Sequence, residues 1–125
     1  LAGMQQRQFG RVVLMNTASS EHGGGLTSFG YGMAKHSVGY LTKHLAKYYT
    51  QDNILTNCLS PGLIETKFHT NVMKRTPEEM LNRSKTVRLR KAGQPEDISR
   101  LIFYLAFENN FVTGQNIKID GGDFL

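Results

Sequence analysis

The sequence has few of the residues and segments that mark specialised classes of protein. It has one cysteine, Cys58, so a disulfide framework is excluded, and we interpret this residue as a small buried side chain in a reducing compartment. The four histidines have no cysteine partners and no spacing typical of metal ligands, so no metal site is expected. No apolar run is long enough to cross a bilayer, and no basic-then-apolar segment opens the chain. These absences favour a cytoplasmic protein that does not enter the membrane.

Positive charge is concentrated in one stretch of the chain. The formal net charge is +5, and five basic residues lie close together: Arg83, Lys85, Arg88, Arg90 and Lys91. Such a run can attract nucleic acid or an acidic or phosphorylated substrate, or it can be a solvated face. Because no nucleic-acid-binding motif accompanies it, the solvated face is the favoured interpretation and nucleic acid is not an expected partner.

Hydrophobic patterning predicts strands that alternate with helices. Segments 12–15, 54–59 and 116–119 read as buried strands. Two helices are predicted between the second and third strands, one starting at Thr76-Pro77 and the other at Pro95. This alternation predicts a parallel sheet, right-handed crossovers and one continuous α/β unit.

A stronger helix is predicted between the first two strands. Ala34, Val38, Leu41 and Leu45 recur at helical spacing and define one apolar stripe. We expect this stripe to pack against the sheet.

Tyr31 and Lys35 lie at the start of this helix. Because they are four residues apart, they share a helix face beside the stripe, and both heads are expected to point toward the packed interior. Free tyrosine has a pKa of about 10, and a neighbouring ammonium stabilises the phenolate. The pair is therefore a candidate proton donor and acceptor for the interconversion of a carbonyl and an alcohol. The Tyr-x-x-x-Lys pattern alone also arises by chance in amphipathic helices.

Further landmarks accompany this pattern, in segments 10–17, 57–66, 93–98 and 113–122. In this order, and over nearly the whole chain, they resemble the short-chain dehydrogenase/reductase family. The resemblance implies that residues 1–125 form the C-terminal, substrate-side half of a doubly wound parallel-sheet Rossmann-like fold. The N-terminal dinucleotide-binding half of that fold is absent from these residues.

The resemblance implies catalytic roles for Tyr31 and Lys35. Tyr31 would exchange a proton with the oxygen of a small carbonyl or alcohol substrate. Lys35 would lower the pKa of the tyrosine and hydrogen-bond the nicotinamide ribose. The catalytic serine of the family has no exact match: alignment by the strand places its role at Thr17, whereas counting back from Tyr31 lands on Ala18, next to Ser19. Thr17 and Ser19 are therefore both candidates.

The resemblance also implies a binding surface for NAD or NADP. Pro61, Gly62, Ile64 and Thr66 would line the nicotinamide side, with the backbone of Ile64 meeting the carboxamide. A Pro-Gly turn suits this role because it brings backbone close to a ligand. A purely structural turn is the alternative.

The chain has no G-x-G-x-x-G motif, and the family carries its glycine-rich turn upstream of these segments. Most affinity for the dinucleotide should therefore be absent from this chain alone. The first strand should lie at an unprotected edge, which favours a homo-oligomer or another partner chain. The three glycines within 21–25 suggest a flexible rim, and segment 67–90, the substrate lid by resemblance, could suit an anionic or sugar-like substrate.

Two functions follow from these observations. The first is a fragment or truncated form of an NAD(P)-dependent oxidoreductase that transfers hydride between nicotinamide and a carbonyl or secondary alcohol. The alternative is a non-catalytic remnant that acts as an oligomeric or partner-binding module.

Overall fold

The structure is a computed structural model that describes residues 1–125. Three parallel strands, β1 (Gly10–Met15), β2 (Ile54–Pro61) and β3 (Asn116–Ile119), form one sheet in the order β1-β2-β3. All three predicted strands are confirmed, and the first two are each two residues longer than predicted. β1 has a partner on one side only, so it is the edge strand that the sequence predicted.

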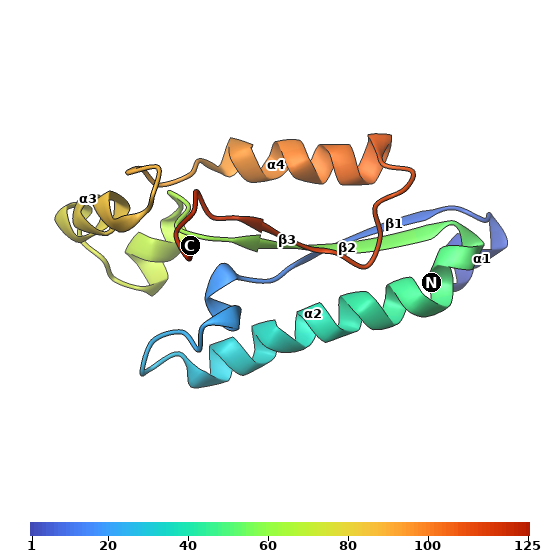
Figure 1. The fold of residues 1–125 in the computed structure, drawn as a ribbon, viewed down its shortest axis with the longest axis horizontal. Helices are drawn as coiled ribbons and strands as arrows, with labels where there is room; N and C mark the ends of the chain where they lie inside the picture. The colour runs from blue at the N-terminus through green and yellow to red at the C-terminus, as the bar shows by residue number, and fades with distance from the viewer.

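Helices cover both faces of the sheet (Figure 1). α2 (Phe29–Tyr49) connects β1 to β2, and α4 (Pro95–Phe103) lies on the connection from β2 to β3. Residues of β2 alternate between the two helices: Cys58 lies beside Thr42 of α2, whereas Leu59 packs with Ile98 of α4. The sheet is therefore the middle of three layers.

The two crossovers have opposite hands. Both move the chain in the same direction across the sheet, but their helices cover opposite faces (Figure 1). We assign the preferred right hand to the direct β1-α2-β2 crossover. The β2-α4-β3 crossover then has the left hand, so the predicted right hand is wrong for the second crossover. The preference for a right hand applies when a strand feeds directly into its crossover helix. Here another helix, α3 (Pro77–Thr86), intervenes before α4 begins.

Both helices of this long connection start where the sequence predicts. Thr76 caps α3, because its Oγ1 accepts a hydrogen bond from the Glu79 backbone N–H at 3.2 Å and Glu79 Oε2 accepts from the Thr76 N–H at 2.7 Å. At the start of α4, Asp97 Oδ2 accepts from the Gln94 N–H at 2.8 Å.

Short elements complete the chain. α1 (Ala2–Gln6) precedes β1, the 3-10 helix η1 (Ala18–Glu21) follows β1, and η2 (Thr50–Asp52) follows α2. Two π-helical turns, η3 (Phe68–Val72) and η4 (Tyr104–Glu108), precede α3 and follow α4. None of the helices combines the length and the apolarity needed to cross a membrane.

Only half of the predicted apolar stripe of α2 faces the sheet. The residues that face the sheet are Val38, Thr42, Leu45 and Ala46. Ala34 and Leu41, the other members of the predicted stripe, are exposed, with Leu41 at 44%. The small side chains of Thr42 and Ala46 allow α2 to lie close to β2, which leaves the bulkier Leu41 on the outer face.

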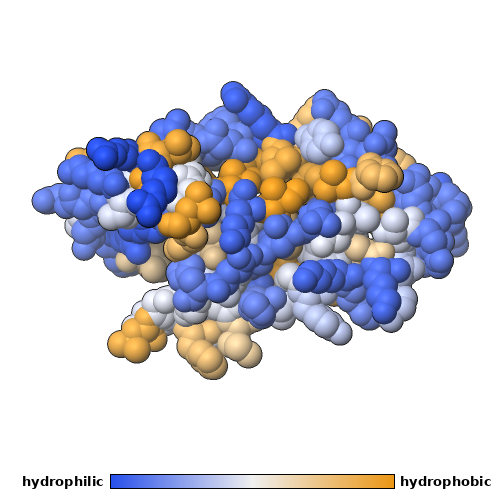
Figure 2. Space-filling view, viewed as in Figure 1, coloured by the Kyte–Doolittle hydropathy of each residue, from blue (hydrophilic) through white to orange (hydrophobic).

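The core lies between β2 and α4. Its four most buried members are Leu59, Ile64, Ile98 and Leu105. A fully buried leucine or isoleucine side chain contributes roughly 1.5–3 kcal/mol to folding. Figure 2 shows a band of apolar side chains between α4 and the sheet, where this core reaches the surface. The core therefore anchors β2, whose carboxyl end carries part of the candidate site.

Candidate active site

The candidate residues gather at the carboxyl end of the sheet. Thr17 and Ser19 follow β1, the Pro61-Gly62 turn ends β2, and Tyr31 lies in the first turn of α2. Parallel strands present their carboxyl ends at one edge, which is where open α/β sheets bind ligands. The loop of residues 16–22 is called the hydroxyl loop below.

Lys35 fastens the start of α2 to the end of β1. Its Nζ donates a hydrogen bond to the Met15 carbonyl oxygen at 2.9 Å. The same Nζ lies 5.9 Å from the centroid of the Tyr31 ring. The ammonium therefore stays beside the tyrosine while it is held by the backbone of β1.

Tyr31 does not point into the packed interior, so that expectation is wrong. Its side chain is 44% exposed, and its ring lies 6.4 Å from the ring of Phe68, with an angle of 28° between the planes. Tyr31 lies in the first turn of α2, beyond the end of β1, so no strand covers it. The phenol is thus open to a ligand, with an ammonium on one side and an aromatic ring nearby.

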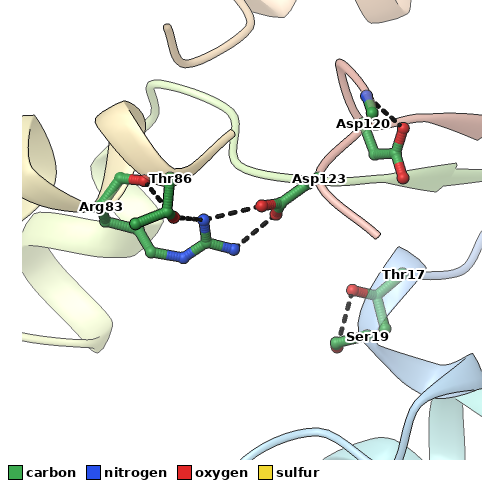
Figure 3. Close-up of polar contacts among 7 residues, drawn as sticks. Thr17, Ser19, Arg83, Thr86, Asp120 and Asp123 are labelled. Carbon is green, nitrogen blue, oxygen red and sulfur yellow. Dashed lines mark hydrogen bonds and ion pairs between the residues drawn. The ribbon is translucent and has the colours of Figure 1, made fainter. Parts of the chain in front are cut away.

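The structure brings the two candidate hydroxyls together (Figure 3). Thr17 Oγ1 and Ser19 Oγ lie 3.1 Å apart, and either atom can be the donor. Ala18, between them, is buried and anchors the hydroxyl loop to the protein. Neither hydroxyl makes another hydrogen bond to the protein, so each retains capacity for a ligand oxygen.

The Gly62 backbone lies close to another part of the protein, whereas the sequence suggested a close approach to a ligand. A Cβ atom at this position would lie 2.7 Å from the Cα of Asp120, and the Gly62 N–H donates to the Ile119 carbonyl at 3.0 Å. Packing of the turn against the end of β3 is therefore sufficient to require glycine here. Pro61 and Gly62 are both half-buried.

Ile64 offers free backbone groups. Its neighbours are bound to Gly93: the Gly93 N–H donates to the Leu63 carbonyl at 2.9 Å, and the Glu65 N–H donates to the Gly93 carbonyl at 2.8 Å. In such a parallel bridge, the N–H and C=O of Ile64 itself point away from Gly93, and neither makes a hydrogen bond within the chain. One donor and one acceptor side by side match the two hydrogen-bonding groups of a carboxamide. Thr66, two residues on, is exposed.

The predicted flexible rim is anchored at its first two residues. Glu21 forms an ion pair with Lys118 at 2.6 Å and accepts a hydrogen bond from Asn116 Nδ2 at 2.9 Å. The ring of His22 lies 4.0 Å from the ring of Phe124. All three partners lie in or beyond β3, so sequence neighbours gave no sign of these contacts.

Arg83 forms a partly buried ion pair and is not only part of a solvated face (Figure 3). Its two terminal nitrogens donate to the two carboxylate oxygens of Asp123 at 2.7 and 2.5 Å, and Nη1 also donates to Thr86 Oγ1 at 2.6 Å. The Asp123 side chain is 3% exposed. This pair joins α3 to the end of the chain, and no local sequence signal indicated it.

His69 is the histidine with a perturbed titration. Burial lowers its pKa below the ordinary value, and the positive charges of Arg75 and Arg83 lower it further. Its Nδ1 is buried and has no hydrogen-bond partner. The imidazole, which belongs to the lid segment itself, is therefore neutral at neutral pH. No group of histidine, cysteine, aspartate and glutamate side chains is arranged to hold a metal ion.

Known proteins are similar to this chain in sequence and in fold. A family model described as enoyl-(acyl carrier protein) reductase matches residues 1–123. The human protein dehydrogenase/reductase SDR family member 4 is 34% identical over 122 residues, which cover 95% of this chain and 42% of the relative. The chain belongs to the short-chain dehydrogenase/reductase family. Tyr31 and Lys35 form the Tyr-x-x-x-Lys pattern, one of the landmarks that carry the resemblance.

Other short-chain dehydrogenases/reductases extend the comparison. The 3-oxoacyl-[acyl-carrier-protein] reductase FabG of Chlamydia pneumoniae is 38% identical over 93 residues, which cover 74% of this chain and 36% of the relative. The crystal structure of 3-oxoacyl (acyl-carrier-protein) reductase from Agrobacterium tumefaciens C58, with NADP bound, matches with a TM-score of 0.87 at 29% identity. That match covers 98% of this chain and 48% of the other. The chain thus spans less than half the length of each of these relatives.

Proposed function

We propose that the chain is the substrate-side, catalytic portion of an NAD(P)-dependent oxidoreductase. Its reaction moves hydride between a nicotinamide and a carbonyl or secondary alcohol. The observation that carries the proposal is the open phenol of Tyr31 beside the ammonium of Lys35, at the sheet edge that also holds the hydroxyl loop. Family membership and the NADP-bound relative support it.

Tyr31 is the proposed proton carrier. In the reducing direction its phenol gives a proton to the substrate oxygen, and in the oxidising direction the phenolate takes a proton from the alcohol. The Lys35 ammonium stabilises the phenolate through its charge. Thr17 or Ser19 donates a hydrogen bond to the same substrate oxygen and orients it, as their free hydrogen-bonding capacity permits.

The nicotinamide has a proposed place beside these groups. When bound, this cofactor supplies or accepts the hydride. The free N–H and C=O of Ile64 bind its carboxamide. Pro61, Gly62 and Thr66 line the nicotinamide, and Lys35 hydrogen-bonds its ribose. The free Ile64 groups are the feature of this chain that fits the cofactor most directly.

The isolated chain is proposed to bind the dinucleotide weakly. Its 125 residues lack the G-x-G-x-x-G turn whose backbone N–H groups hold a pyrophosphate. Titration calorimetry with NADH and NADPH on this polypeptide, with its mass in solution measured beforehand, tests this point. No measurable heat of binding is expected, whereas tight binding by a monomer would contradict it.

An anionic substrate or carrier is the proposed substrate class. Segment 67–91 has eight basic and two acidic residues, while the rest of the chain has seven basic and eight acidic residues. All of the net positive charge therefore lies in the segment that carries Phe68, the aromatic neighbour of Tyr31. A field of this sign raises the local concentration of anions, and its effect falls with ionic strength.

Self-association through the outer face of α2 is also proposed. Tyr40, Leu41 and Tyr48 are exposed on this helix, and the ring of His44 lies 4.9 Å from that of Tyr48. Such a cluster of apolar and aromatic groups is typical of an interface. Sedimentation of wild type against Leu41→Glu tests it, with a lower mass expected for the variant.

A joined enzyme tests the reaction itself. The joined enzyme is the Agrobacterium tumefaciens reductase in which residues 1–125 of this chain replace the matched segment, so that a complete dinucleotide site is present. We expect oxidation of NADPH or NADH with small ketones or anionic 3-oxo compounds, followed at 340 nm. A joined enzyme that binds NADPH but turns over no carbonyl compound would contradict the proposed function.

A further inference from the structure

We propose that residues 120–125, called the clamp segment, couple the position of α3 to that of the hydroxyl loop. Asp123 and Phe124 are its positioning residues. They touch neither Tyr31 nor Lys35, and they act through the elements that they hold. The consequence for catalysis rests on the proposed function, but the coupling itself can be measured without cofactor or substrate.

One side of the clamp segment holds α3. The paired hydrogen bonds between Arg83 and Asp123 are charge-assisted, and the Asp123 carboxylate is almost fully buried, which makes them stronger than a fully exposed ion pair. The Leu89 N–H adds a backbone bond to the Gly121 carbonyl at 3.2 Å. The helix and the loop after it are therefore each tied to the clamp segment.

The other side holds the hydroxyl loop. Phe124 directly follows Asp123, and its ring packs on His22 at 4.0 Å between centroids. Glu21, the neighbour of His22, is bound by Lys118 and Asn116 of β3. A single peptide bond thus separates the residue that holds α3 from the residue that holds the loop with Thr17 and Ser19. The short distance along the chain allows movement on one side to be passed to the other.

The backbone of the clamp segment is shaped for this turn. Gly121 and Gly122 have φ angles of 63° and 77°, in the left-handed region that favours glycine. Asp120 Oδ1 accepts a hydrogen bond from the Gly122 N–H at 2.9 Å (Figure 3). A side chain at either glycine would also crowd the loop after α3, because a Cβ at Gly121 would lie 3.1 Å from Val87 Cγ1.

The residues on either side of α3 have strained backbone conformations that depend on surrounding contacts. Lys74 and Arg90, which bracket α3, are non-glycine residues with φ angles of 55° and 53°. Each such conformation costs free energy and persists only where the surrounding contacts impose it. The bonds from Asp123 and Gly121 are contacts of this kind. Loss of the clamp should therefore loosen α3 and, through Phe124, the hydroxyl loop.

Hydrogen exchange on the 125-residue polypeptide tests the coupling. Asp123→Asn should speed amide exchange in residues 77–86 about tenfold, and should also speed it in residues 17–22, which Asp123 does not touch. Phe124→Leu disturbs the contact on the other side. It should speed amide exchange in the hydroxyl loop directly, and in α3 through the coupling. Glu108→Gln, an exposed carboxylate without a partner, is the matched control and should change neither region.

Exchange in β2 is the internal reference for global stability. If Asp123→Asn also speeds exchange throughout β2, that variant has lost global stability, and the test of the coupling rests on the milder Phe124→Leu. Faster exchange in both α3 and the loop at unchanged β2 supports the coupling. Changes confined to the mutated side, or no change in either region, would overturn it. If the joined enzyme kept its activity without Tyr31, the proposed function would be contradicted, but these exchange results would be unaffected.

Discussion

Lys35 Nζ lies 2.9 Å from the carbonyl oxygen of Met15, the last residue of β1. This bond joins the helix that carries Tyr31 to the strand that leads into the hydroxyl loop. The lysine therefore has a structural role as well as its proposed electrostatic one, and the two roles can be separated by experiment.

Replacing Lys35 by methionine should cost both stability and activity. The variant keeps the length of the side chain but leaves the Met15 carbonyl without its donor, so the free energy of unfolding should fall by about 1 kcal/mol. Urea denaturation measures this change. Lys43→Met, at an exposed position of the same helix without a hydrogen-bond partner, is the control. Equal stability of the two variants would show that the bond contributes nothing.

Replacing Gly62 by alanine should disturb the turn after β2. The added Cβ would meet the Cα of Asp120 at 2.7 Å, so either β3 or the turn must shift, at a cost of about 1–3 kcal/mol. Gly32→Ala is the matched control, because a Cβ there meets nothing within 4 Å and alanine favours a helix. The midpoint temperature of thermal unfolding should therefore fall for Gly62→Ala and rise slightly for Gly32→Ala. A tolerated Gly62→Ala would mean that the turn is looser than the structure shows.

His69 should make stability depend on pH. The folded protein holds the pKa of this imidazole below its ordinary value of about 6.5, so the unfolded chain binds the proton more readily. Its contribution to stability is therefore fully present above about pH 6.5 and is lost as the pH falls through the folded-state pKa. Urea unfolding between about pH 7.5 and pH 5 should show a shallower decline for His69→Gln than for wild type. Parallel pH profiles would contradict the assignment.

Cys58 should be chemically inert in the folded protein. Burial raises the pKa of its thiol, and its Sγ donates a hydrogen bond to Asn116 Oδ1 at 3.3 Å. Labelling by a thiol reagent at about pH 8 should be at least about tenfold slower than in urea, because the thiolate is the reactive form. Fast labelling of the folded chain would show that the centre of the sheet opens readily.

Local patterns predicted most of the elements and the pairing of Tyr31 with Lys35. Four-residue spacing on a helix is enough to place those two side chains together, and the strands follow from short apolar runs. The face of α2 was harder to predict, because Leu41 and Thr42 are adjacent and only the packing of β2 determines which of them is buried. The predicted stripe was therefore half wrong.

Contacts between distant residues lay beyond these patterns. Arg83 and Asp123 are 40 positions apart, and neither has a local feature that marks it as a buried partner. The left-handed second crossover likewise results from the long connection that contains α3. The anchoring of Glu21 by Lys118 was likewise not expected, because the prediction of a flexible rim rested only on the nearby glycines.

The reaction rate of Tyr31→Phe in the joined enzyme tests the central claim most directly. Phenylalanine keeps the ring beside Phe68 and removes only the proton-carrying hydroxyl. The rate of NADPH oxidation at saturating substrate should fall about a hundredfold to ten-thousandfold, with NADPH affinity measured by calorimetry unchanged. A variant that retained its rate within about threefold of wild type would contradict the assignment of Tyr31 as the proton carrier.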